Sequence, residues 1–272
     1  MADISDETHL LHKFLDVPRG KDWGDFKKPV LVLDGLAQEW KSNAKFSAKR
    51  AYIIGVNDKS FDRVCCALST DVVSFYEMRV TDISSLAKIS GLRRLSINWN
   101  SKLADLSPLT FLSQLDALAL IDTSKASDLS PVAALKKLRA FEFSGSPTLS
   151  SKNTAESLRP LGELKALEEL RLKNLKVVNG GLQPLAACSS LKRLSVANTF
   201  PTEDYAFLAA KLPKVSCRHF AATVPVDGNA IGEGIDTMVV GKRKPFLSSS
   251  KDADRIHKYE TQFEKLKAKY LE

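Results

Sequence analysis

The sequence is poor in the residues that most often carry catalysis or bind metal ions. Its 272 residues contain four histidines, at positions 9, 12, 219 and 257, and no Cys/His spacing typical of a zinc site. His9 and His12 would share one face of a helix, but no third ligand accompanies them. Phosphate-binding glycine loops, dinucleotide fingerprints and the H-E-x-x-H and G-x-S-x-G motifs are also missing. We therefore expect a protein without enzymatic activity, catalytic residues, cofactor or metal site.

Long hydrophobic runs are missing too. No segment approaches the ~20 apolar residues that a membrane-spanning helix needs, and the acidic, polar start of the chain is unlike a signal peptide. Cys65 and Cys66 are adjacent and cannot easily bridge to each other, while Cys188 and Cys217 fall at apolar positions typical of buried thiols. These features favour a cytoplasmic protein with reduced cysteines and no membrane partner.

The charge is moderately basic. The net charge is +8, and residues 242–272 contribute half of it, with nine Lys/Arg against five Asp/Glu, a difference of +4. A solvated surface explains this excess, although an acidic protein or a nucleic acid would also be attracted by it. The hydrophobic fraction of 44% excludes wholesale disorder.

Leucine, in contrast, recurs at fixed spacing. Positions three apart are typical of a tight helical turn, and a closing pair two apart is typical of a short strand with alternate side chains facing inward. Prolines at 108, 131, 160 and 184 keep step with the repeat and suit the first turn of a helix. Leucine or a close substitute fills this six-position code in five segments: 83, 86, 89, 92, 95 and 97; 106, 109, 112, 115, 118 and 120; 129, 132, 135, 138, 141 and 143; 158, 161, 164, 167, 170 and 172; and 182, 185, 188, 191, 194 and 196.

One repeat cannot bury its own leucines, so the repeats must stack and their strands must pair in parallel. The pattern predicts an α/β fold, a curved leucine-rich-repeat solenoid with a parallel sheet on the concave face and short helical turns on the convex face. The predicted strands are Met78–Val80, Leu95–Ile97, Leu118–Leu120, Phe141–Phe143, Leu170–Leu172 and Leu194–Val196.

These repeats resemble the internalin-like class of leucine-rich repeats, which includes a eukaryotic phosphatase-regulator group. The resemblance covers about residues 75–217; it implies the fold and, in general terms, a binding function, and we expect a bacterial cytoplasmic member. That class usually has an asparagine in the turn after each strand. Only Asn100 holds this position here, so we expect an irregular turn network; the replacements are Thr123, Ser146, Leu175 and Thr199.

The pattern divides the chain into three parts. Residues 1–70 are expected to form an N-terminal cap with degenerate repeats, since residues 30–33 and 52–56 are typical of strands and His9 could open a short helix. Residues 71–217 are the leucine-rich repeats, ending in a weaker sixth copy. Residues 218–272 are expected to form a C-terminal cap with a strand at 237–240 and an amphipathic helix over 251–271. That helix either covers the open end of the solenoid or serves as a coiled-coil arm.

One repeat is longer than the others, because the segment Ser144–Ser157 adds about six residues. Insertions of this kind project from one rim of a solenoid and often bind partners. Here the insertion either closes over a partner or is a tolerated surface loop.

The residues between and just after the strand leucines should line the concave face. We expect the row to begin with Glu77, Arg79 and Thr81 and to end with Lys214, Ser216 and Arg218. Its middle is small and apolar, near an aromatic side chain and rimmed by cations, as protein-binding surfaces often are. The alternative is that the alanines merely avoid clashes. The candidate partner-binding residues are Arg79, Arg94, Asn98, Trp99, Ala119, Ile121, Asp122, Glu142, Arg171, Lys173 and Arg193.

Two functions fit these patterns. The first is a non-enzymatic module that binds another protein on its concave face, such as a regulatory subunit or a toxin-immunity protein. The second is a nucleic-acid-binding protein that uses the basic C-terminal half, including the Gly241–Pro245 loop, although few exposed aromatics are available for stacking on bases. Neither the partner nor the oligomeric state follows from the sequence.

Overall fold

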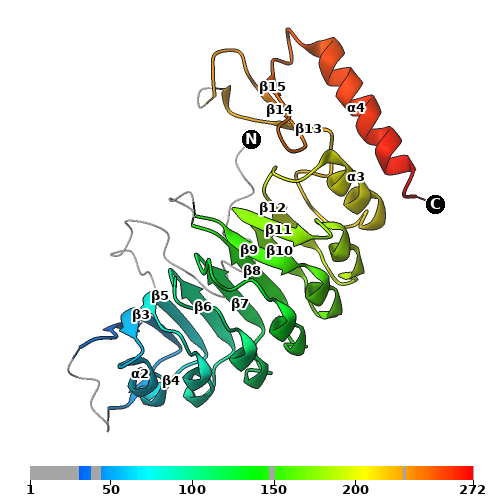
Figure 1. The fold of residues 1–272 in the computed structure, drawn as a ribbon. Helices are drawn as coiled ribbons and strands as arrows, with labels where there is room; N and C mark the ends of the chain where they lie inside the picture. The colour runs from blue at the N-terminus through cyan, green and yellow to red at the C-terminus, as the bar shows by residue number, and fades with distance from the viewer. Residues whose placement is uncertain (1–30, 38–43, 147–150, 229–230, 272) are drawn as a thin grey trace.

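The computed structural model describes residues 31–37, 44–146, 151–228 and 231–271. Its main feature is a sheet of eight strands that pair in parallel in the order β1-β3-β5-β6-β7-β8-β10-β12 (Figure 1). The strands are β1 (Leu31–Asp34), β3 (Arg50–Asn57), β5 (Val72–Arg79), β6 (Arg94–Asn98), β7 (Ala117–Ile121), β8 (Ala140–Ser144), β10 (Glu169–Leu172) and β12 (Arg193–Val196).

A short helix precedes each of the later strands and packs on the other side of the leucine core. Four of the 3-10 helices have proline in their first turn, as the periodic prolines predicted. The strand leucines, such as Leu95, Leu118 and Leu170, are completely buried. The helices are α2 (Phe61–Ala67), η2 (Ser84–Lys88), η3 (Ser107–Phe111), η4 (Ser130–Ala134), η5 (Arg159–Glu163), η6 (Gln183–Ala187) and α3 (Thr202–Lys211).

The predicted solenoid is confirmed, and its sheet extends further toward the N-terminus than the clear repeats. The strands expected near residues 30–33 and 52–56 are β1 and β3, which continue the same sheet. Between β3 and β5 the chain forms helix α2, where the later repeats have a 3-10 turn; the sequence did not reveal this helix. Two short strands flank it in the chain, β2 (Phe46–Ser47) and β4 (Leu68–Ser69), and they pair with each other. The helix expected near His9 lies outside the described residues.

The long repeat differs from its expected form. The last five residues of the segment Ser144–Ser157 are not a loop but a strand, β9 (Asn153–Ser157), which pairs in parallel with β11 (Leu175–Asn179). Leu175 lies opposite Asn153, and Asn174 lies in line with Gly145. Residues 146–152 are therefore the inserted segment, and the chain resumes the repeat register at Asn153.

The C-terminal part adds a small antiparallel sheet and a helix. The sheet contains β13 (Thr223–Pro225), β14 (Thr237–Val239) and β15 (Phe246–Leu247), so the expected strand at 237–240 is present. The weak sixth copy forms α3 and continues the main sheet only through a bridge from Ser216 to Arg193. Helix α4 (Ala253–Ala268) packs along α3, with Phe263 completely buried (Figure 1). None of the helices in the described ranges is long and apolar enough to cross a membrane.

Candidate functional site

The register of the sheet arranges the concave side chains in three columns. Arg94, Ser96 and Asn98 of β6 alternate with the buried Leu95 and Ile97. Because side chains alternate along a strand, each residue aligned with these three faces the same way. The first column contains Arg50, Val72, Arg94, Ala117, Ala140, Glu169 and Arg193; the second contains Val32, Tyr52, Ser74, Ser96, Ala119, Glu142, Arg171 and Ser195; the third contains Asp34, Ile54, Tyr76, Asn98, Ile121, Ser144 and Lys173.

This register corrects the predicted start of the row. Phe75 pairs with Ile97 and Tyr76 with Asn98, so the concave residues of β5 are Val72, Ser74 and Tyr76. Glu77, Arg79 and Thr81 come after them and lie outside the columns. The error arose because Met78 and Val80 are buried like strand leucines, whereas the true strand pair is Val73 and Phe75.

The middle of the concave face is buried. Ala117, Ala119 and Ala140 have no exposed surface, and Glu142 and Arg171 are 9% and 3% exposed. The apolar floor predicted from the alanines is therefore present but has no exposed surface. Of the candidate residues, Ala119, Glu142 and Arg171 are buried.

Three cations of the first two columns, Arg94, Arg171 and Arg193, pair with acids on or just before a neighbouring strand. Arg171 Nη1 lies 3.5 Å from Glu142 Oε2, and Arg193 donates to Glu169. Arg94 Nε donates to Asp116 Oδ1 at 3.1 Å. These pairs bridge adjacent repeats, so their role in the fold is to neutralise charge within the sheet. They do not form the free basic row that a nucleic-acid site would need.

The third column and the turns after it remain accessible in the N-terminal half of the sheet. Ile54, Tyr76 and Ile121 are half-buried, and Trp99 is 41% exposed. The rings of Tyr76 and Trp99 meet edge to face with centroids 5.8 Å apart, and Tyr52 stacks on the other side of Tyr76 at 6.5 Å. Val32 of β1 and Leu36 beyond it, both largely exposed, extend this surface toward the N-terminal edge. We call Val32, Leu36, Ile54, Tyr76, Trp99 and Ile121 the apolar strand-end patch. Sequence reasoning found only Trp99 and Ile121. The shifted register hid Tyr76, and Val32, Leu36 and Ile54 precede the clear repeats from which the concave row was predicted.

Five strands have a residue in the left-handed region at or near their end. Trp99 and Asp122 directly follow β6 and β7, with φ of 60° and 52°, and Asn174, at φ 49°, lies two residues beyond β10. Gly55 and Glu77, at φ 66° and 57°, lie near the ends of β3 and β5. Aspartate, asparagine and glycine tolerate this conformation, but for a bulky residue such as tryptophan it is an outlier. Trp99 is therefore held in a conformation that its own side chain disfavours.

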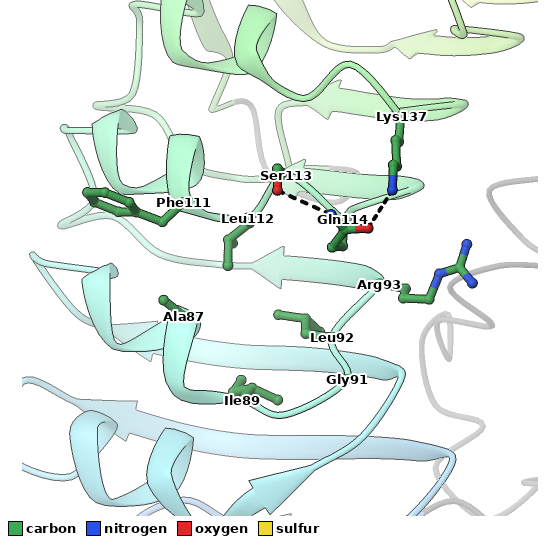
Figure 2. A pocket seen from close by; sticks show the side chains of 10 residues that line it. All are labelled: Ala87, Ile89, Gly91, Leu92, Arg93, Phe111, Leu112, Ser113, Gln114 and Lys137. Atoms are coloured by element: carbon green, nitrogen blue, oxygen red, sulfur yellow. Dashed lines mark hydrogen bonds between the residues drawn. The ribbon is translucent and has the colours of Figure 1, made fainter.

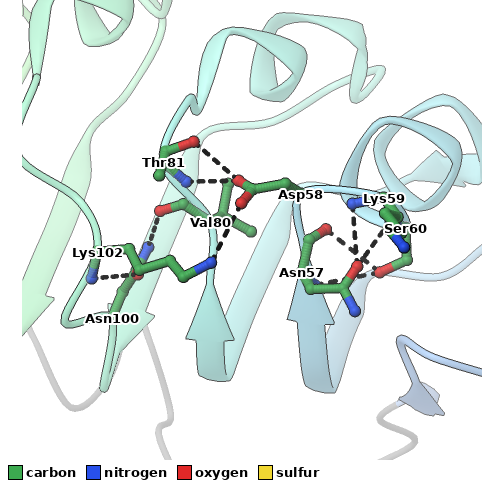
Figure 3. Close-up of polar contacts among 8 residues, drawn as sticks. All are labelled: Asn57, Asp58, Lys59, Ser60, Val80, Thr81, Asn100 and Lys102. Atoms are coloured by element: carbon green, nitrogen blue, oxygen red, sulfur yellow. Dashed lines mark hydrogen bonds and ion pairs between the residues drawn. The ribbon is translucent and has the colours of Figure 1, made fainter.

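Polar side chains tie these turns to one another (Figure 3). Asn100 Nδ2 donates to the Val80 carbonyl at 3.0 Å, and Asp58 accepts from the Thr81 backbone N–H at 2.7 Å. This backbone N–H, aided by the Thr81 hydroxyl and Lys102, holds the pKa of the Asp58 carboxyl below its ordinary value. The first turns are thus fixed in place, and Trp99 projects from a fixed backbone.

A second asparagine fills the class-typical turn position, contrary to the expectation that only Asn100 does so. Asn153 is completely buried, accepts from the Thr123 backbone N–H at 3.0 Å and donates to the Leu120 carbonyl at 3.4 Å. The inserted segment moved it out of its usual spacing, so it was missed. Only the pairing of Asn153 with Leu175, which holds the turn position of the next repeat, identifies Asn153 as the turn residue.

The inserted segment is anchored at both ends. Asn174 Nδ2 donates to the carbonyls of Ser146 and Ser151, each at 2.9 Å, and Ser151 Oγ donates to Asp122 Oδ1 at 2.9 Å. A Cβ on Gly145 would lie 2.5 Å from the Asn174 and Ser151 carbonyl oxygens, so only glycine fits there. We call Asp122, Ser151 and Asn174 the insert junction.

The remaining candidate residues lie on or near this edge. Asn98 is half-buried in the third column, Lys173 is exposed beside the insert junction, and Arg193 is half-buried. Arg79 is exposed and pairs with Glu77 at 3.3 Å, beyond the columns. At the predicted end of the row, Arg218 donates to the Pro225 carbonyl at 3.1 Å.

A separate hollow lies between the loops that lead into β6 and β7 (Figure 2). It measures about 470 Å³ and is floored by Ile89, Leu92 and Leu112. Its polar residues are exposed, and Lys137 Nζ donates to Gln114 Oε1 across its mouth at 2.5 Å. The hollow sits at the opposite ends of the strands from Trp99 and does not belong to the strand-end patch. No group of three metal-ligating side chains occurs in the described part of the chain.

Comparison with solved structures finds similar repeat proteins. An internalin (inlF) from Listeria monocytogenes aligns with a TM-score of 0.45 and 20% identity over 61% of this chain and 44% of its own. An internalin C2 from the same species aligns with a TM-score of 0.45 and 21% identity over 59% of this chain and 64% of its own. The receptor kinase HAESA ectodomain from Arabidopsis, solved with the peptide hormone IDA, aligns with a TM-score of 0.39 and 16% identity over 61% of this chain and 28% of its own.

These alignments cover less than two thirds of the length of each similar chain, and they carry no function over to this one. No protein-family model matches the sequence, and no curated protein matches it either. The architecture instead rests on the chain's own strands, turns and leucine core. Taken together, they form a leucine-rich-repeat solenoid.

Proposed function

We propose that this chain is a non-enzymatic module that binds another protein through the apolar strand-end patch. The observation that carries the proposal is Trp99, which is 41% exposed yet held at φ 60°. A left-handed backbone costs a non-glycine residue roughly 1–2 kcal/mol. Strained residues of this kind concentrate at functional sites.

The surroundings of Trp99 support the same function. Tyr76 braces its ring from the side, so little side-chain freedom remains to be lost on binding. Ile54, Ile121, Val32 and Leu36 offer apolar area on both sides of it. A tryptophan in the centre of an apolar patch is the usual anchor of a protein interface. The apolar strand-end patch replaces the surface predicted from the sequence, which included Ala119 and Arg171; both are buried in the structure.

The test is selection of binding peptides or proteins from a display library on the wild-type chain, followed by affinity measurements on variants. Trp99→Asn combined with Ile121→Thr removes the anchor but keeps residues that suit a left-handed turn and a strand. We expect this double variant to lose affinity at least about tenfold, as central anchors do.

The matched control is Phe111→Ser, which removes an aromatic side chain that is 73% exposed on η3. It should leave affinity within about twofold, because η3 lies on the convex side. Equal affinities for the wild type and the Trp99/Ile121 variant would reject the patch, and a loss confined to Phe111→Ser would move the site to the convex face.

A further inference from the structure

Four exposed lysines surround the insert junction. Lys152 directly follows Ser151, Lys173 precedes Asn174, Lys176 lies two residues beyond it, and Lys125 lies three residues beyond Asp122. The contacts of Asn174 and Asp122 with Ser151, each at 2.9 Å, bring these three stretches of chain together. Three stretches from successive repeats, which together carry these four cations, therefore meet at the insert junction.

These lysines differ from most other cations of the repeats. Among the described residues none of the four has an ion-pair partner, whereas Lys88, Lys136 and Lys192 pair with Asp62, Glu163 and Glu168. One carboxylate, Asp122, belongs to the junction and a second, Glu156, lies near it; each accepts a hydrogen bond from a serine hydroxyl. With four lysines against two carboxylates, the region keeps an excess of positive charge exposed to solvent.

The lysines also adjoin apolar surface. Ile121, which belongs to the apolar strand-end patch, directly precedes Asp122. On the other side Val178 is 54% exposed on the same face of β11 as Lys176, because the two are separated by one residue of a strand. The cations therefore lie next to the apolar strand-end patch, on the side toward the C-terminus.

From this geometry we propose that the partner is an acidic polypeptide segment carrying an apolar side chain. The apolar side chain contacts Trp99 and Ile121, and the carboxylates that follow it lie over Lys125, Lys152, Lys173 and Lys176. This proposal rests on the proposed function and adds the chemistry of the partner. A polypeptide fits better than a nucleic acid because the neighbours of the lysines are aliphatic. The one tryptophan nearby packs edge-on against Tyr76 rather than presenting a row of stacking faces.

The experiment uses the full chain and short random peptides displayed on phage. We expect the enriched peptides to carry Asp or Glu beside an aromatic or branched aliphatic residue. A synthetic, fluorescein-labelled copy of an enriched peptide then serves as the probe for fluorescence anisotropy. Its affinity should fall about tenfold or more in a variant with Lys125→Ser, Lys152→Ser, Lys173→Ser and Lys176→Ser, and binding by the wild type should weaken with added salt.

The matched control removes the same charge elsewhere, through Lys59→Ser, Lys211→Ser, Lys214→Ser and Lys258→Ser, all at exposed positions. It should bind the probe within about twofold of the wild type. If the control loses as much affinity as the junction variant, only net charge matters and the proposed acidic-segment site is wrong.

The remaining outcomes separate this inference from the proposed function. The enriched peptides could lack acidic residues and bind normally to the junction variant but not to the Trp99/Ile121 variant. That result would overturn the acidic partner and still support binding at the apolar strand-end patch. Unchanged binding by both variants would overturn both proposals. A labelled single-stranded oligonucleotide could instead bind the wild type more tightly than any peptide does and fail to bind the junction variant. That result would assign the lysines to nucleic-acid binding and overturn the inference.

Discussion

At the scale of single residues, Asn153 shows how one buried amide maintains the repeat. It satisfies the backbone N–H of Thr123 and the carbonyl of Leu120, which lie in the preceding repeat. A buried donor left without a partner costs about 1–3 kcal/mol. The insertion therefore lengthens the chain without leaving this turn unsatisfied.

We expect Asn153→Ala to lower the free energy of unfolding by about 1–3 kcal/mol, because it leaves the Thr123 N–H buried and unpaired. Urea denaturation of the purified chain measures this loss. Asn179→Ala, at an exposed position of β11, is the control and should change stability by less than about 0.5 kcal/mol. Equal unfolding curves for the two variants would show that Asn153 does not support the turn.

A second residue-scale prediction concerns pH. His219 is 5% exposed, and burial, together with the nearby Arg218, lowers the pKa of its imidazole from 6.5 to about 4. Because the folded-state pKa is the lower one, the unfolded chain binds a proton first as the pH falls. Stability from this group is therefore complete above pH ~6.5 and is lost progressively as the pH falls toward 4.

The loss should amount to about 1 kcal/mol between pH 7.5 and 5.5, a window above the ordinary pKa of the carboxyl groups. Urea denaturation at the two pH values measures it, with His219→Leu as the comparison. The difference between the two pH values should shrink in that variant. If wild type and His219→Leu show the same pH dependence, another group is responsible.

At the scale of elements, the same spacing of three produced two different structures. In the middle repeats it forms single 3-10 turns, where proline begins the turn and the chain enters a strand a few residues later. In the sixth copy Thr202–Lys211 has no proline after its start and contains three alanines, so it continues as an α-helix. That longer helix supplies the surface on which α4 packs.

Helix α4 contributes Phe263 to the hydrophobic core. A more peripheral contact joins the rings of Tyr270 and Phe207, whose centroids are 5.1 Å apart. We expect Phe263→Ala to destabilise the chain by about 3–5 kcal/mol, since it leaves a cavity in a packed interior. A thermal melt measures the effect. Phe246→Ala, at 44% exposure, is the control and should shift the melt far less. Similar melts would mean that α4 is a free arm rather than a cap on α3.

At the scale of the whole molecule, the strand-end edge of the sheet collects the features that suit binding. Its N-terminal half carries Trp99 and the apolar patch, and the lysines of the insert junction follow in the middle. At the C-terminal end Asn198 bonds to the Val239 carbonyl and to the Gly241 N–H, so the small antiparallel sheet covers that part of the edge. From the N-terminal to the C-terminal side of this edge, apolar surface is therefore followed by exposed positive charge.

The basic loop near the C-terminus has a structural explanation at this scale. Lys242 N–H donates to the Phe200 carbonyl, and Lys244 Nζ lies 5.4 Å from the centre of the Tyr259 ring. The loop thus connects the last repeat with α4. Its cations and those of the concave columns do not form one continuous track, which weakens the nucleic-acid alternative.

The leucine spacing alone determined the repeat, the strands β6, β7, β8, β10 and β12, and their buried positions, because one short code must satisfy the same packing in every copy. The aromatic start of the concave face could not be predicted in this way. In β5, Val73, Phe75 and Met78 are all apolar. Only the pairing with β6 shows that Val73 and Phe75 align with the strand positions Leu95 and Ile97.

Tertiary structure also decided which outward residues are accessible. Arg171 and Trp99 both looked like contact residues in the sequence, yet Arg171 is 3% exposed beside Glu142 and Trp99 is 41% exposed. Likewise, only the register across β9 and β11 shows that Asn153 fills a turn, and only the contacts of Ser151 show that the stretches carrying the four lysines come together. Local spacing specifies which way a side chain points from its own strand; burial and the assembly of a site depend on residues distant in the chain, which no local pattern encodes.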